Sequence, residues 1–213
     1  MPTYAACLID VYETVLSFDQ VRHAELIATC AGVPVERLVG AAGPWGAKVT
    51  DGRLSLADAM AGMLLECGVE ADDAMVELLV AADQRAIHEL TVLHPDTVPF
   101  LEALRAAGVR TGFVSNCAAN TRPMLDALGL SALVDELVLS CEVGAAKPEP
   151  AIYRIALDRL GVEAGQAVFI DDQQVFCDGA RQLGITAVRI DRRDGTGDVN
   201  TLAALTGTLT DRT

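Results

Sequence analysis

The chain has 213 residues and a formal net charge of −14, with 51% hydrophobic and 22% charged residues. A chain of this length and composition folds into one good-sized globular domain, or into a core with an insert. Its acidic excess repels the phosphates of nucleic acids and anionic lipids, so we expect no nucleic-acid or membrane partner and favour a small-molecule substrate.

The short apolar stretches and the unpaired spacing of the cysteines predict a cytoplasmic protein. No apolar stretch approaches the roughly 18 to 20 residues that span a bilayer, and no secretory signal pattern is recognisable at the start of the chain. The six cysteines are scattered without paired spacing, which predicts free thiols and neither a disulfide framework nor a zinc site. The sequence leaves a homodimer open.

The first predicted element is a strand over residues 5–9, an apolar run that ends at Asp10. A carboxylate at the carboxyl end of a strand lies where open α/β sheets place their chemistry. Taken alone, a turn or helix-capping role would be an equally good interpretation of Asp10. Thr14 follows four residues later, where its hydroxyl could cap the next helical turn.

The next region, residues 17–93, is predicted to be an all-helical insert. Its apolar residues recur at helical spacing, and it contains no convincing strand. We expect helix breaks at Gly32 to Pro34 and at Gly43-Pro44. Since the insert leaves the core directly after Asp10, it is placed to act as a cap that excludes water and selects the substrate.

From residue 94 onward, predicted helices alternate with short strands. Helices are expected over residues 96–107, 121–128, 149–160 and 176–183, and strands over residues 109–114, 136–139, 167–170 and 187–190. Such alternation is typical of a Rossmann-like α/β fold, a parallel sheet with helices on both faces. The first strand must join this sheet, so the predicted core is discontinuous, comprising residues 1–16 and 94–213.

Polar residues follow the later strands as well. Ser115 and Asn116 follow the strand over residues 109–114, and Asp171 and Asp172 follow the strand over residues 167–170. Lys147 precedes two prolines at a helix start. Each has a purely structural interpretation, as a helix cap, an acidic turn or a helix-start signal. Because carboxyl ends of parallel strands share one edge of a sheet, we favour a common site.

These segments resemble the motifs of the haloacid dehalogenase (HAD) superfamily of hydrolases. Those motifs are a nucleophilic Asp followed four residues later by Thr, a Ser or Thr that ends a second strand, a Lys, and an acidic pair. The resemblance implies a hydrolase in which Asp10 is the nucleophile and Thr14 orders its loop. It also implies that Ser115, Asn116 and Lys147 contact the substrate, that Ser115 and Lys147 assist catalysis, and that the insert is a small helical cap.

The acidic residues imply a metal. Asp171 and Asp172 converging with Asp10 would repel one another in a partly desolvated cleft unless a cation relieves the repulsion. Mg²⁺ prefers such oxygen ligands and can bridge to a phosphate. We therefore expect Mg²⁺ to be held by Asp10, the backbone carbonyl of Tyr12, Asp171 and Asp172. The structural alternative is an exposed acidic turn in an acidic chain.

Tyr12 departs from the superfamily's phosphatases, which carry a second Asp two residues after the nucleophile as general acid and base. A phenol with a pKa near 10 is poorly suited to that task.

The favoured function is a magnesium-dependent phosphatase acting on a small phosphorylated metabolite. The substrate could then carry a good leaving group, as an acyl phosphate does. The alternatives are a 2-haloacid dehalogenase, whose branch carries Tyr at this position and lacks the metal, and a catalytically impaired ligand-binding protein. Tyr12 is expected to bind substrate by shaping the pocket. Glu13 is a weak candidate for the missing acid, and none of the three histidines is assigned to the site.

Overall fold

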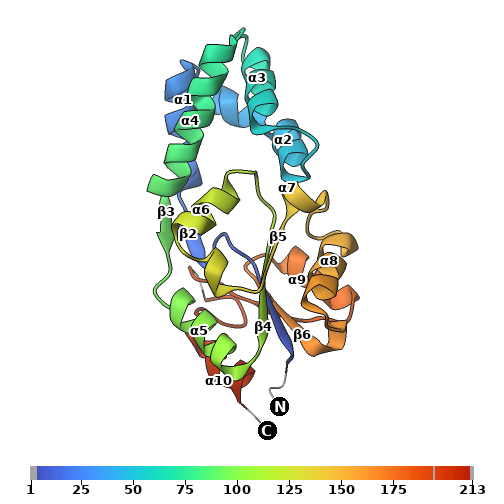
Figure 1. Ribbon diagram of the computed structural model, residues 1–213. Helices are drawn as coiled ribbons and strands as arrows, with labels where there is room; N and C mark the ends of the chain where they lie inside the picture. Colours follow the sequence, from blue (N-terminus) through green and yellow to red (C-terminus); the bar gives the residue numbers. More distant parts are fainter. Residues whose placement is uncertain (1–3, 194, 212–213) are drawn as a thin grey trace.

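The computed structural model describes residues 4–193 and 195–211 of the chain. Its core is a five-stranded parallel sheet with the strand order β5-β4-β1-β6-β7 (Figure 1). The strands are β1 (Ala6–Ile9), β4 (Arg110–Ser115), β5 (Glu136–Leu139), β6 (Ala167–Asp171) and β7 (Thr186–Arg189). This confirms the predicted Rossmann-like sheet. The outermost residues of the predicted core, 1–3 and 212–213, lie outside the described residues, as does residue 194.

Helices cover both faces of the sheet, as predicted. On one face lie α5 (Thr97–Ala107) and α10 (Ala203–Thr210), and on the other α8 (Pro150–Leu160) and α9 (Gln174–Gln182) (Figure 1). Alternate side chains of β1 enter the two apolar cores, and all four of its residues are fully buried. Burial on both faces explains why β1 is a continuous apolar run without polar alternation.

The core also contains shorter elements, which are α6 (Thr121–Ala127), α7 (Ser140–Val143) and the 3₁₀ turns η1 (Ser131–Leu133) and η2 (Ala164–Gln166). Helix α10 was not predicted, since its threonines and glycine are weak helix formers. It forms because Leu205 and Leu209 are buried in the same apolar cluster as the α5 residues Leu101 and Leu104.

Residues between the first two core strands form four helices, α1 (Gln20–Ala31), α2 (Val35–Thr50), α3 (Leu56–Glu66) and α4 (Asp73–Glu89). We call α1–α4 the helical insert. It has its own apolar core, which includes Ile27, Leu38, Met60, Leu64 and Leu79. Figure 1 shows the insert beyond the carboxyl ends of the sheet strands, while α5 and α10 lie towards the opposite end of the molecule.

Two details of the insert differ from the predictions. A short antiparallel pair, β2 (Leu16–Phe18) and β3 (Thr91–Leu93), joins it to the core, although no strand was predicted there. Helix α2 continues through Pro44, so the predicted break at Gly43-Pro44 is wrong. The carbonyl of Gly40, which loses its helical partner at Pro44, lies on an exposed residue, and water can satisfy it at little cost. The division into domains at 16/17 and 93/94 stays a proposal.

Within the described residues, no single helix is long and apolar enough to cross a membrane. Helices α1 and α2 are long and apolar enough only when taken together, and they are bent by 106° relative to each other.

The sheet order determines where the chain can build a site. Strand β1 lies between β4 and β6 in parallel register, so residues that follow these three strands meet at one edge. From β1 the chain proceeds towards β4 and β5, and it then crosses to β6 and β7 on the other side. In open α/β sheets such a change of direction leaves a crevice at the carboxyl ends of the strands.

Candidate active site

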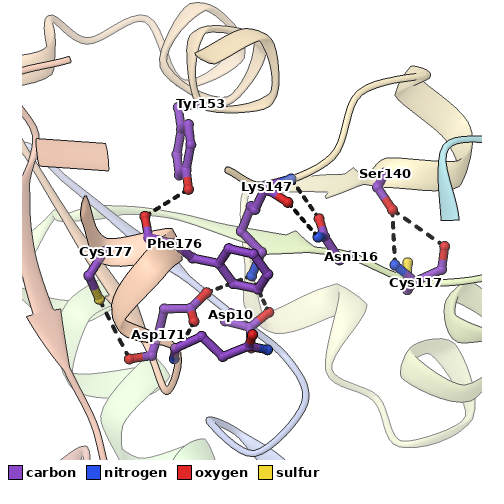
Figure 2. Close-up of polar contacts among 10 residues, drawn as sticks. Asp10, Asn116, Cys117, Ser140, Lys147, Tyr153, Asp171, Phe176 and Cys177 are labelled. Atoms are coloured by element: carbon purple, nitrogen blue, oxygen red, sulfur yellow. Dashed lines mark hydrogen bonds and ion pairs between the residues drawn. The ribbon is translucent and has the colours of Figure 1, made fainter. Parts of the chain in front are cut away.

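A buried lysine joins two carboxylates at this edge. The Nζ atom of Lys147 donates hydrogen bonds to Oδ1 of Asp10 and Oδ2 of Asp171, both at 2.6 Å (Figure 2). Asp10 follows β1, Asp171 ends β6, and Lys147 lies between α7 and α8. All three are buried, with 5% or less of each residue exposed. Three predicted site residues from separate segments are therefore in direct contact.

Asn116 fixes the backbone on which Lys147 is carried. Its Nδ2 donates to the Lys147 carbonyl at 2.8 Å, and the Lys147 amide donates to its Oδ1 at 2.7 Å (Figure 2). The lysine side chain also lies near the rings of Phe169 and Phe176, at 5.4 and 5.0 Å from their centroids. Asn116, predicted to contact substrate, is thus a residue that positions the lysine, and substrate contact stays a prediction.

Burial governs the electrostatics of the site. It raises the pKa of Asp10 to about 7, although Lys147 opposes the shift. Burial also raises the pKa of Asp171, and Lys147 again opposes the shift. Burial and the charge of Asp10 together raise the pKa of Asp172 to about 6. Burial lowers the pKa of Lys147, but Asp10 and Asp171 outweigh it and hold that pKa above its ordinary range. One ammonium is therefore surrounded by more carboxylates than it can neutralise.

The three carboxylates fit a hard divalent cation. Oxygen atoms of Asp10, Asp171 and Asp172 lie within 4.8 Å of one another. Oδ1 of Asp172 is buried, and no described residue hydrogen-bonds to it. Such a set of oxygen donors suits Mg²⁺, which needs few protein ligands because it keeps several waters. The geometry brings these three predicted ligands together, whereas the predicted contact through the Tyr12 carbonyl stays a prediction.

Two hydroxyl groups of the predicted site also lack partners among the described residues. They are Oγ1 of Thr14 and Oγ of Ser115, and both residues are fully buried. Buried polar atoms are nearly always hydrogen-bonded, so an unpartnered one calls for an explanation such as a bound ligand. Thr14 and Ser115 are two of the predicted catalytic residues, and a phosphoryl group would offer oxygen acceptors for both hydroxyls.

Tyr12, two residues after Asp10, is engaged through its hydroxyl. The hydroxyl lies 2.8 Å from Oγ1 of Thr121, and the ring meets that of Phe18 edge-on at 6.1 Å. Burial raises the pKa of Tyr12 above its ordinary value of about 10. The tyrosine therefore stays protonated, and it is a weaker acid than an exposed phenol.

The loop after Asp10 is held from the C-terminal part of the chain. Arg192 Nε donates to the Thr14 carbonyl at 2.7 Å, and its guanidinium pairs with Asp96 at 3.1 Å. Glu13 adopts a left-handed backbone conformation (φ 58°), which few residues other than glycine adopt. Its carboxylate pairs with Arg193 at 2.7 Å and accepts from a backbone amide of β2. Glu13 is thus occupied as a structural anchor of this loop.

A cavity of about 390 Å³ opens between this edge and the helical insert. Core residues Asp10, Tyr12, Lys147 and Asp172 line one side, and residues of α1, α3 and α4 line the other. A second cavity, of about 670 Å³, lies beside β2 and β3. Asp10 does not line it, so we assign the chemistry to the smaller cavity.

The insert contributes polar residues that the sequence did not reveal. His23 on α1 pairs through Nε2 with Oδ1 of Asp83 on α4 at 2.8 Å. Asn120, at the start of α6 in the core, donates to Oδ2 of the same aspartate at 2.5 Å. All three line the cavity that contains Asp10. No motif spacing could indicate them, because His23 and Asp83 are 60 positions apart and meet only when α1 packs on α4.

Comparisons with known proteins agree with this geometry. The haloacid dehalogenase-like hydrolase family matches residues 4–184. A phosphatase from Mycobacterium tuberculosis is 30% identical over 215 residues, covering 94% of this chain and 96% of its own. An (S)-2-haloacid dehalogenase from Pseudomonas sp. is 36% identical over 110 residues, covering 50% of this chain and 47% of its own.

A solved structure shares the fold. A HAD family enzyme from Bacteroides thetaiotaomicron, in complex with magnesium and inorganic phosphate, has a TM-score of 0.73 and 20% identity, covering 90% of this chain and 96% of its own. The residues matched by the family include both the loop after Asp10 and the acidic pair Asp171 and Asp172. The chain is an enzyme and belongs to the haloacid dehalogenase-like hydrolase family.

Proposed function

We propose that this hydrolase is a magnesium-dependent phosphatase that acts on a small phosphorylated, hence anionic, metabolite through a phosphoaspartyl intermediate at Asp10. The observation that carries the proposal is the convergence of the Asp10, Asp171 and Asp172 carboxylates beside the buried ammonium of Lys147. Two similarities support it. The similarity to the Mycobacterium tuberculosis phosphatase extends along nearly the whole chain, and the Bacteroides enzyme of the same fold binds magnesium and phosphate.

Asp10 is the proposed nucleophile, and we assign the attack to its Oδ2 because Lys147 holds Oδ1. As Oδ2 attacks phosphorus, a bond forms between them and the bond from phosphorus to the leaving oxygen breaks. Thr14 and Ser115 would donate their unpartnered hydroxyls to phosphoryl oxygens, while Lys147 opposes the negative charge. Attack of water on phosphorus then releases phosphate and frees Asp10.

Four residues would hold the metal, namely Asp10, Asp171 and Asp172 through carboxylates and Tyr12 through its carbonyl. When bound, Mg²⁺ would offset the charge of the carboxylates and of the phosphate, so that two anions can approach each other. Lys147 alone cannot do so, because it is already shared between Asp10 and Asp171.

Turnover of a panel of phosphate esters and acyl phosphates, with Mg²⁺ and with chelator, tests the proposal. We expect phosphate release that needs the metal, and a loss of about five orders of magnitude in Asp10→Asn, the scale seen when a nucleophile is removed. Asp178→Asn, which changes an exposed aspartate of α9, is the matched control and should keep full activity. Metal-independent turnover, or an active Asp10→Asn variant, would overturn the proposal.

The second candidate is displacement of halide from a 2-haloacid by Asp10. Tyr12 favours it, since its ring lines the cavity and halide leaves without a proton. The half-length similarity to the Pseudomonas dehalogenase also favours it. The acidic pair weighs against it, because Asp171 and Asp172 would repel a carboxylate substrate in the absence of a metal. Halide release that survives chelator would establish this reaction in place of phosphate hydrolysis.

A further inference from the structure

A histidine–aspartate pair forms part of the insert side of the active-site cavity. Nε2 of His23 lies 2.8 Å from Oδ1 of Asp83, and the two side chains are 25% and 5% exposed. The other oxygen of Asp83 accepts from Asn120 at 2.5 Å. Asp83 thereby links the insert to the core, and it holds His23 in the cavity that Asp10 also lines.

The contact with Asp83 occupies one nitrogen of the imidazole and leaves the other available. Asp83 occupies Nε2, and the ring of Phe18 packs against the imidazole with 5.3 Å between centroids. Among the described residues, no hydrogen-bond partner is found for Nδ1 of His23. A carboxylate bound to one imidazole nitrogen fixes the tautomer and stabilises the imidazolium, which prepares the second nitrogen for proton transfer.

The other titratable groups that line the cavity are Asp10, Tyr12, Glu13, Asp83, Cys117, Lys147 and Asp172. Asp10, Lys147 and Asp172 have their own roles in the proposed function. Glu13 is paired with Arg193, and Asp83 is held by two donors.

The remaining two groups, Tyr12 and Cys117, are poor acids. Burial raises the pKa of Tyr12, and a hydrogen bond with Cys141 raises that of Cys117. Among the titratable groups that line the cavity, His23 is therefore the one whose side chain is suited to proton transfer and has a nitrogen available for it.

We infer that His23, oriented by Asp83, is the general acid and base of this enzyme, in place of the aspartate that Tyr12 replaces. The inference rests on the proposed phosphatase function. As the bond from phosphorus to the leaving oxygen breaks, that oxygen takes the proton from Nδ1 of the imidazolium. Neutral His23 then removes a proton from the water that attacks the aspartyl phosphate, which regenerates the imidazolium and releases phosphate.

The test compares leaving groups. His23→Gln keeps a donor for Asp83 and cannot transfer a proton. We expect it to slow the hydrolysis of an alkyl phosphate by about 10² to 10⁴, the usual contribution of a general acid, whereas the formation of the aspartyl enzyme from acetyl phosphate changes little. Single-turnover measurements isolate that first step. His88→Gln, which changes an exposed histidine of α4, is the matched control and should behave as wild type.

Chemical rescue provides the second measurement. In His23→Ala, added imidazole should restore a large part of the alkyl phosphatase activity, which it would not do for a residue of purely structural importance. An active wild type together with an equal loss in the rate of aspartyl-enzyme formation for all leaving groups, or with no loss, would overturn the role of His23 and leave the phosphatase proposal intact. A wild type that releases no phosphate from any substrate would overturn both.

Discussion

The two sides of the active-site cavity are built in different ways. On the core side, Asp10, Lys147 and Asp171 stand at strand ends or on an anchored loop, and all are buried in one charge network. On the insert side, His23 projects from a helix, and its partner Asp83 contacts the core through Asn120. The difference teaches that the proposed nucleophile is fixed by the sheet. The proposed proton transfer, by contrast, depends on how the insert packs against the core.

The largest effect expected on this comparison comes from moving the proposed proton-transfer group from the insert to the core. In a His23→Gln background, Tyr12→Asp should raise alkyl phosphate hydrolysis by about 10² to 10⁴, because an acid would again stand beside the nucleophile. In the wild-type background the same substitution should change the rate only a few-fold, since His23 already acts. Steady-state kinetics of the four proteins measures the coupling. Equal effects of Tyr12→Asp in both backgrounds would show that the two positions do not share a task.

One lysine of the core and one of the helical insert extend the comparison to stability. Lys147→Met leaves Asp10 and Asp171 buried without their cation, and we expect a loss of about 3 to 5 kcal/mol in the free energy of unfolding. Lys48→Met in the insert removes a cation over the ring of Trp45 and should cost about 1 kcal/mol or less. Urea unfolding in the presence of chelator gives both values. Similar losses in the two variants would contradict the contrast.

The smallest expected effect is the change in Mg²⁺ affinity per pH unit. It tests the core side alone, because all the proposed metal ligands are core residues. Burial raises the pKa of Asp10 to about 7 and that of Asp172 to about 6, and Mg²⁺ binds the ionised forms. Apparent affinity should therefore be constant above pH 7, fall up to tenfold per pH unit from 7 to 6, and fall more steeply below.

Calorimetry in buffers of different ionisation enthalpy measures this affinity and the protons that are released. His23→Gln should leave the profile unchanged, because His23 is not among the proposed ligands. An affinity that does not change between pH 8 and 5.5 would contradict the proposed ligand set.

Much of the core could be predicted from the sequence, because its signals are local. The buried run of β1 and the polar residues after β1, β4 and β6 follow the strand-end rule, and the parallel sheet brings Asp10 and Asp171 together. Helix α10 and the β2–β3 pair could not be predicted, since both form through tertiary contacts that outweigh weak local preferences.

The insert side of the site was beyond sequence reasoning for a related reason. His23 and Asp83 come from two helices, and Asn120 directly precedes a third. Neither helical periodicity nor a motif encodes which of these residues meet. The roles of Asp10, Thr14, Ser115 and Lys147 stay predictions that the geometry supports. For Tyr12, the sequence indicated the missing acid but gave no sign of where a substitute stands.

The contact of Arg192 with the Thr14 carbonyl spans almost the entire chain, and Arg193 pairs with the neighbouring Glu13. Both arginines lie after residue 184, where the family match ends. Since a protein is synthesised from its N-terminus, the loop that follows Asp10 is made well before the two arginines, which come after β7, the last strand of the sheet. The order of synthesis thus delays the completion of this loop until every strand of the sheet has been made.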